Sequence, residues 1–200
     1  MVDFAAAGDL VSFVCAAGLM AHYVGDACQP LHVSELHHGH SKAEAGVHSA
    51  YETSMLNQFT DELLAAIGSA KSGWPSVPVV DGTGQAAAAA VVELMRRTVK
   101  RLPPAKVVDT YNDNPGRGRG QAMWDKLGDD TAACIFDGSI TLARIWQGAW
   151  RKGRAGKANP KLPTQPCPQT ALKALYMKAT FLPSAKLQDL REKNGRLIIQ

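Results

Sequence analysis

Apolar residues recur at three- and four-residue spacing along most of the chain, which is the periodicity of amphipathic helices. Many of these positions are alanine, the residue with the highest intrinsic helix propensity. Alternating runs of β-branched residues hardly occur, so the predicted fold class is all-α. The pattern predicts helices over residues 6–27, 46–67, 84–101, 129–152 and 169–180, with a short one over 184–193.

Prolines divide these predicted helices, because proline lacks a backbone donor and disfavours helix at the residue before it. The breaks fall at Pro30, Pro75, Pro78, Pro103, Pro104, Pro160 and Pro183. Segment 112–120 is rich in asparagine and glycine, which indicates an exposed loop. The predicted organisation is a helical domain over 1–152, a linker over 153–168 and a C-terminal helical appendage over 169–200. The last five residues fit either a strand or an unpaired tail.

The chain has 200 residues, of which 46% are hydrophobic and 20% charged. This is enough for one domain with a buried core, and it excludes disorder along the whole length. The longest uncharged apolar run, Leu10 to Tyr23, is shorter than the roughly 18 residues that a membrane-spanning helix needs, so we expect no transmembrane segment. The first four residues lack the basic region of a secretory signal, which leaves the compartment unassigned. The four cysteines are scattered without a Cys-x-x-Cys pair, so the sequence signals neither a thiolate zinc site nor a disulfide scaffold.

Charge is distributed unevenly along the chain. Residues 1–93 contain 2 Lys or Arg against 10 Asp or Glu, and residues 94–200 contain 20 against 8. A basic surface for an anionic partner is one interpretation. Two halves of opposite charge that pack on one another or face solvent explain the asymmetry equally well.

All six histidines lie between residues 22 and 48. His22 and Asp26 are four residues apart on a predicted helix, so both side chains project from one face. His48 and Glu52 repeat this spacing on the next predicted helix, and His32 lies in the bend between the two helices. Imidazole and carboxylate donors without a thiolate suit zinc, with manganese or iron as weaker alternatives. The constellation therefore predicts a metal site.

Two simpler interpretations stand beside this one. A single histidine–acid pair on a helix surface needs no metal, and only the whole constellation favours one. His37, His38 and His40 lie in a glycine-containing loop, for which a solvated loop is the favoured interpretation and additional metal ligands the alternative. Cys28 is most simply a small buried residue.

The string His22-Tyr-Val-Gly-Asp26-Ala-Cys-Gln-Pro-Leu-His32, followed by His48-Ser-Ala-Tyr-Glu52, resembles the signature of a known superfamily. It is similar to His-x3-Asp-x5-His followed by His-x3-Asp or His-x3-Glu, the pattern of the zinc-dependent phospholipase C and single-strand-specific zinc nuclease superfamily. All five ligand positions match in order and spacing. The resemblance is strong over residues 21–52, extends as an all-helical remainder to about 152 and is absent beyond.

The resemblance implies an all-α bundle with up to three zinc ions. By position, His32, His48 and Glu52 would form one complete zinc site. His22 and Asp26 would supply half of a second, and Asp26 would bridge to a third ion and act as the catalytic group that orients the attacking water. The family's further N-terminal ligands have no counterpart in the first 21 residues. Either the chain is the C-terminal portion of a longer protein, which we favour, or it is a reduced form with an incomplete cluster.

The function expected from the resemblance is a zinc-dependent phosphoesterase. Its substrate would be a phosphodiester of single-stranded nucleic acid or of a phospholipid head group, hydrolysed by a metal-activated water. Glu52 favours the phospholipase branch and the basic half of the chain favours the nuclease branch. The alternative is a truncated, non-catalytic helical module with one structural zinc. A secreted or periplasmic location would follow if a signal peptide lies upstream.

Overall fold

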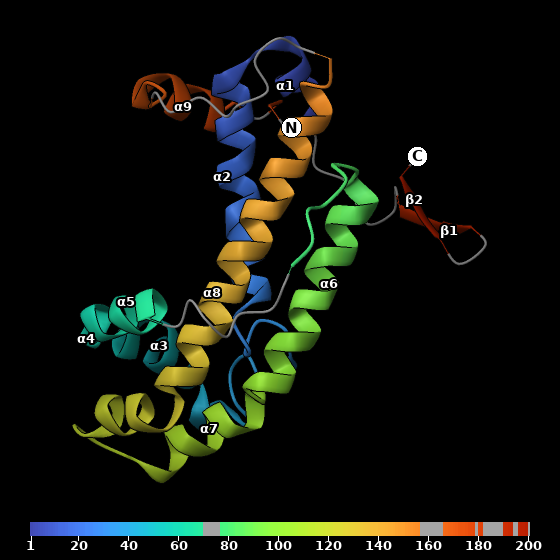
Figure 1. Cartoon of the computed structure of the whole chain (residues 1–200). Helices are drawn as coiled ribbons and strands as arrows, with labels where there is room; N and C mark the ends of the chain where they lie inside the picture. Colours follow the sequence, from blue (N-terminus) through green and yellow to red (C-terminus); the bar gives the residue numbers. More distant parts are fainter. Residues whose placement is uncertain (70–76, 157–165, 179, 182–189, 194–195, 200) are drawn as a thin grey trace.

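The computed structural model describes residues 1–69, 77–156, 166–178, 180–181, 190–193 and 196–199. Most of this part is helical, which confirms the predicted all-α class (Figure 1). The long elements are α2 (Leu10–Ala27), α6 (Gly84–Arg101) and α8 (Arg119–Gly153), and the shorter ones are α1 (Val2–Ala7), η1 (Lys42–Glu44), α3 (Val47–Ser49), η2 (Ala50–Met55), α4 (Leu56–Gln58), α5 (Thr60–Ser69), α7 (Pro104–Asp113) and α9 (Gln169–Tyr176).

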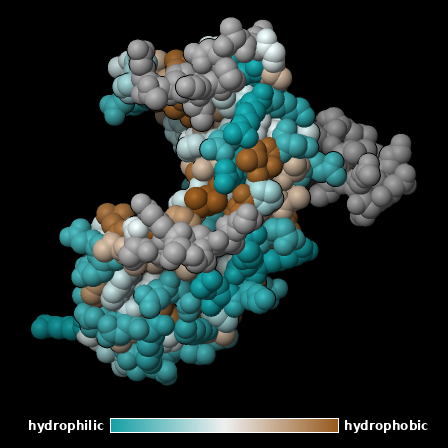
Figure 2. Space-filling model, viewed as in Figure 1, coloured by the Kyte–Doolittle hydropathy of each residue, from teal (hydrophilic) through white to brown (hydrophobic). Residues whose placement is uncertain are grey.

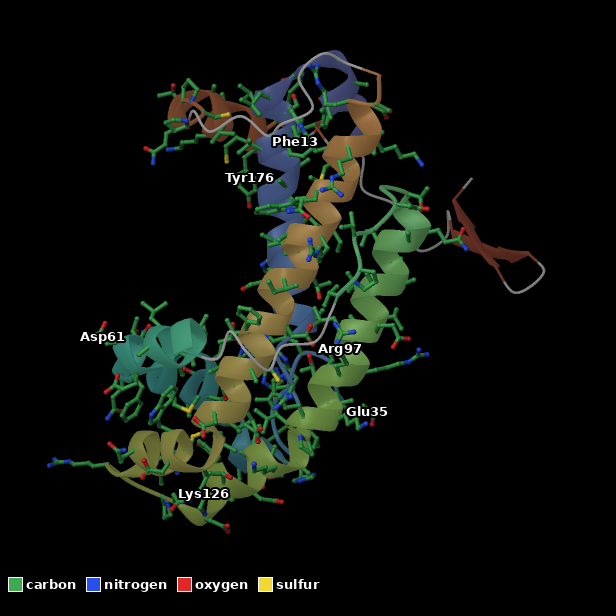
Figure 3. The ribbon with its side chains drawn as sticks, viewed as in Figure 1. Phe13, Glu35, Asp61, Arg97, Lys126 and Tyr176 are labelled. Atoms are coloured by element: carbon green, nitrogen blue, oxygen red, sulfur yellow. The ribbon has the colours of Figure 1, made fainter. Side chains whose placement is uncertain are left out.

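Helix α8 runs along the length of the molecule and contacts α1, α2, α5, α6, α7 and η2 (Figure 1). It can do so because apolar residues recur along one face of its 35 residues, from Met123 to Trp150. A bidentate ion pair adds a polar link to α6: Arg97 Nε and Nη2 donate to Asp137 at 2.7 and 2.8 Å. In Figure 3 Arg97 lies between the two helices. Helix α8 is therefore the scaffold on which the N-terminal helices are placed.

Local sequence explains most helix ends. Asp9 caps α2 by accepting a 3.0 Å hydrogen bond from the Ser12 backbone, and Thr83 caps α6 in the same way through Ala86. Helix α7 was not predicted, because Pro103 and Pro104 were interpreted only as a break. Proline is favoured at the first helical position, where its missing N–H would have no partner.

Other boundaries also differ from the predictions. Helix α8 begins at Arg119, so the end of the predicted 112–120 loop belongs to it. The helix predicted over 46–67 is divided into four short pieces, of which η2 is a π-helix. The prediction of a short helix over 184–193 is wrong for the described residues 190–193. They form strand β1 (Leu190–Lys193), which pairs antiparallel with β2 (Arg196–Ile199). Residues 184–189, and 157–165 of the predicted linker, lie outside the described part.

The largest core cluster holds the segments around the histidines. Leu31, Val47 and Met55 are fully buried in it, and they pack with Met123 and Leu127 of α8. Leu31 lies in the bend after α2, Val47 is the first residue of α3, and Met55 is the last residue of η2. Burial of these side chains, worth about 1.5–3 kcal/mol each, fixes the bend and η2 against α8.

Helix α2 packs against α1, α6, α8 and α9. By length and composition alone α2 is long and apolar enough to cross a membrane, and among the described helices it alone meets that criterion. The core helix of a soluble protein meets the same criterion, so the finding is weak evidence. The surface is hollowed between α9 and the segment α3–α5, and apolar residues gather beside the hollow (Figure 2).

Candidate metal centre

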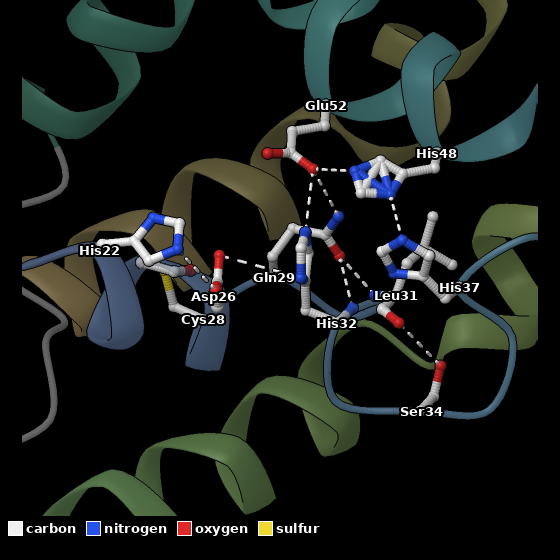
Figure 4. Close-up of polar contacts among 11 residues, drawn as sticks. His22, Asp26, Cys28, Gln29, Leu31, His32, Ser34, His37, His48 and Glu52 are labelled. Atoms are coloured by element: carbon white, nitrogen blue, oxygen red, sulfur yellow. Dashed lines mark hydrogen bonds and ion pairs between the residues drawn. The ribbon is translucent and has the colours of Figure 1, made fainter. Parts of the chain in front are cut away.

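The predicted site residues come from three neighbouring segments (Figure 4). His22 and Asp26 lie on the last two turns of α2, His32 lies in the bend that follows, and His48 and Glu52 lie on α3 and η2. The bend is held by Gln29, whose Oε1 accepts hydrogen bonds from the backbone of Leu31 and, at 3.2 Å, of His32. This turn directs His32 toward η2.

Three imidazole rings meet at this place. One nitrogen each of His32, His37 and His48 can be chosen so that all lie within 4.8 Å of one another, and His48 Nδ1 is 3.0 Å from His37 Nε2. Donors bound to one tetrahedral zinc ion at about 2.0–2.1 Å lie about 3.3 Å apart, so small side-chain rotations bring this set to coordinating distance. The residues present fit a transition metal that prefers nitrogen ligands.

Glu52 adds a carboxylate to this group. Its Oε2 lies 3.1 Å from His32 Nε2 and pairs with His48 Nε2. The two ring nitrogens of His48 therefore face different partners, His37 on one side and Glu52 on the other. A single ion accepts only one of them, so the set with His37 and the predicted set with Glu52 are alternatives for one metal.

His22 and Asp26 lie beside the imidazole group and outside it. Asp26 is 3.6 Å from His22 and 3.8 Å from His32 Nδ1, so it lies between the two rings. The His22 side chain is 72% exposed. The structure thus brings His32, His48 and Glu52 together as predicted and leaves His22 and Asp26 as a neighbouring pair.

His37 is the site residue that the sequence interpretation missed. A solvated loop was favoured for His37, His38 and His40, but the His37 ring contacts both His32 and His48, with ring centroids 4.9 and 4.1 Å away. The bend has no helical periodicity, so spacing gave no signal for its direction. The local density of histidine was the signal available.

The electrostatics of the group favour cation binding. Partial burial, followed by repulsion from neighbouring imidazoles, lowers the pKa of His37. Partial burial also lowers the pKa of His48, against the opposing effect of Glu52. Burial by itself would raise the pKa of Glu52, but hydrogen bonds from His32 and Gln29 outweigh it and lower that pKa. Near pH 7 His37 and His48 therefore offer neutral imidazole lone pairs, and Glu52 offers an ionised carboxylate.

Of the polar residues near the group, Gln29 contacts the carboxylate directly. Gln29 Nε2 donates to Glu52 Oε2 at 3.2 Å. Tyr51 shares a buried 3.0 Å hydrogen bond with Thr131 of α8. Glu35 is exposed near α6 (Figure 3). Cys28 is buried as predicted, and burial raises the pKa of its thiol to about 11, so it supplies no thiolate.

Comparison with known proteins gives one relevant relative. The chain is 35% identical over 213 aligned positions to a protein of Bradyrhizobium tropiciagri named "Probable serine protease". The alignment covers 95% of this chain and 27% of that protein, so the chain spans about a quarter of the length of the relative it matches. No protein-family model matches the chain, and no solved structure matches it.

This relative corrects the predicted function. The prediction of a zinc-dependent phosphodiesterase, whether nuclease or phospholipase C, is wrong, because the relative is named a protease. The predicted phosphodiester substrate and the role of Asp26 in orienting water for that reaction depended on this prediction, so they are wrong as well. The resemblance of the ligand pattern to the zinc phospholipase C and nuclease superfamily stays a prediction.

Because the relative is named a serine protease, the contacts of the serine hydroxyls in this chain are relevant. Within the described residues, no serine hydroxyl is hydrogen-bonded to a histidine. Ser12 donates to Asp9, Ser34 to the Leu31 carbonyl and Ser139 to the Ile135 carbonyl. A serine nucleophile activated by histidine requires such a contact, so the described part of the chain presents a histidine group that could bind a metal ion, and no Ser–His pair.

Proposed function

We propose that this chain is the metal-binding helical unit of a longer hydrolase that acts on peptide bonds, with zinc as its ion. The observation that carries the proposal is the convergence of one nitrogen each of His32, His37 and His48 within 4.8 Å. Support for a peptide hydrolase comes from the relative's printed name and from the extent of the match, 95% of this chain.

The donor set supports zinc over other ions. Three imidazoles and a nearby carboxylate, without thiolate, form the kind of ligand set that zinc accepts in hydrolytic sites, where a fourth position stays open. A bound zinc ion supplies a Lewis acid that polarises a carbonyl group. Calcium and magnesium prefer all-oxygen ligands, so three imidazoles disfavour both.

Gln29 and Glu52 have separate roles beside the imidazole group. Gln29 holds Glu52 by one hydrogen bond and the bend by two others, so it fixes the carboxylate relative to His32. Glu52 is 40% exposed and ionised, and in the set with His37 its Oε2 can accept a proton from a bound polar group.

Zinc titration of the metal-free protein by isothermal calorimetry tests the proposal. We expect one zinc ion per chain with micromolar or tighter affinity, and loss of that binding in a His32→Ala/His48→Ala variant. His22→Ala is the matched control, because His22 is exposed and lies outside the imidazole group. Unchanged zinc binding in the double variant would overturn the assignment of the site.

A second experiment separates metal chemistry from serine chemistry. The longer protein is assayed for peptide hydrolysis with a chelator and, separately, with a serine-directed fluorophosphonate. Inhibition by the chelator and recovery with zinc support a role for this unit in hydrolysis. Fluorophosphonate labelling of a serine within this chain, with activity insensitive to the chelator, would contradict it.

A further inference from the structure

A pocket of about 390 Å³ lies between α2, η2 and α8, next to the imidazole group. Its interior surface is mainly apolar: Val24 comes from α2, Leu56 follows η2, and Ile135 and Leu142 lie two turns apart on α8. Such a volume is in the range of ligand pockets in proteins and is enough for a short aliphatic or aromatic group.

The same pocket includes polar residues of the candidate metal centre. Glu52, Gln29, Asp26 and His22 all line it, and Gln29 and Glu52 are joined by the 3.2 Å hydrogen bond described above. Glu52 is thus shared, because its Oε2 also lies 3.1 Å from His32. A ligand that fills the apolar part would therefore place its polar end against Glu52, which lies beside His32 and His48 (Figure 4).

The rest of the lining offers few polar partners. The Tyr51 hydroxyl is occupied by Thr131, and the Cys28 thiol donates to the Gly25 carbonyl at 3.1 Å. Lysine and arginine are absent from the described residues that line the pocket. A polar or anionic group placed among these side chains would lose hydrogen bonds to water without gaining others from the protein, which costs free energy. Burying an apolar group carries no such cost.

We propose that this pocket binds the aliphatic or aromatic side chain of an acyl compound, an amide or an ester, whose carbonyl end lies against Glu52 and the imidazole group. The inference rests on the proposed function, since it names the substrate class of the same site. It adds a specificity determinant on α8, which contributes none of the metal-binding residues.

Alkyl hydroxamates serve as probes, because their head group binds zinc and their tail length can be varied. The protein is first titrated with zinc, and acetohydroxamate and hexanohydroxamate are then titrated into the zinc-loaded sample by calorimetry. Each methylene group buried in the pocket is expected to tighten binding about fourfold. The longer probe should therefore bind at least tenfold more tightly.

Ser139 allows a matched pair of variants. It lines the pocket, is exposed on α8, and its hydroxyl donates only to the Ile135 carbonyl one turn earlier. Ser139→Trp places an indole in the pocket and should remove the advantage of the longer tail, while acetohydroxamate and zinc bind as before. Ser139→Ala leaves the pocket open and should keep the advantage.

The outcomes distinguish this inference from the proposed function. A sample that takes up no zinc overturns the proposed function, and this inference with it. A sample that binds zinc but gives equal affinity for both probes, or keeps the chain-length advantage in Ser139→Trp, overturns this inference alone. Zinc binding, a chain-length advantage in the wild type and its loss only in Ser139→Trp support both.

Discussion

The close approach of α2 and α8 leaves no room for a larger side chain where the two helices touch. Gly138 of α8 lies against Cys28 at the end of α2: a Cβ at Gly138 would be 2.6 Å from the Cys28 sulfur and 2.8 Å from its Cβ. Attractive contacts between such atoms lie near 3.5–4.0 Å, so an alanine there overlaps by about 1 Å. Cys28 is 8% exposed and hydrogen-bonded to Gly25, which limits its retreat.

Gly138→Ala combines two opposing effects. Overpacking of this kind lowers the free energy of unfolding by about 1–3 kcal/mol. Replacing a helical glycine by alanine raises it by about 0.5–1 kcal/mol. We expect a net loss of about 1–2 kcal/mol in the free energy of unfolding. Urea denaturation followed by circular dichroism would show it as a midpoint lower by roughly 0.5–1 M.

Two further variants control this experiment. Gly18 of α2 has no atom within 4 Å of its would-be Cβ, so Gly18→Ala should stabilise the protein by about 0.5–1 kcal/mol. A Cys28→Ala background removes the contact with the sulfur and keeps the 2.8 Å contact with the Cβ of residue 28, so Gly138→Ala should cost about 1 kcal/mol less there than in the wild type without becoming stabilising. Equal stabilisation by alanine at positions 18 and 138 would refute the packing argument.

Three other predictions concern the imidazole group. His37→Ala should weaken zinc binding about 100-fold, because roughly 10–16 kcal/mol of zinc affinity shared over four ligands is about 3 kcal/mol each; His38→Ala, outside the group, is the calorimetric control and should change affinity less than threefold. The pKa values of His37 and His48 are lowered below their ordinary 6.5 on folding, so the unfolded state binds more protons and the metal-free protein should lose stability as pH falls through and below 6.5. Urea midpoints at pH 7.5 and 5.0 measure this, and a midpoint unchanged between them would contradict it. Gln29→Ala frees Glu52 and the bend and should weaken zinc binding about 10- to 100-fold, whereas affinity equal to wild type would show that Gln29 does not position the site.

The sequence predicted the parts of the fold that depend on periodicity. The end of α2 at Ala27, and the same-face placement of His22 with Asp26 and of His48 with Glu52, follow from helical spacing. The start of α7 could have been found from Pro104, since proline suits the first turn of a helix.

Other features depend on contacts that spacing does not encode. The division of residues 47–69 into four pieces includes the π-helix η2, which is fixed by packing of Tyr51 and Met55 against α8. His37 reaches its partners through an irregular bend that Gln29 and the buried Leu31 hold in place. The pocket beside Glu52 is formed by α8, more than 70 residues further along the chain, so its lining could not be predicted from the histidine pattern.

The position of the donors along the chain has a consequence for folding. All three imidazoles and the carboxylate lie between residues 32 and 52, so the loops that close on bringing them together are short and cost little entropy. The chain emerges from the ribosome from its N-terminal end, and this stretch is free long before α8 is made. An ion captured at that stage would fix the bend early and present a finished surface on which α8 later docks.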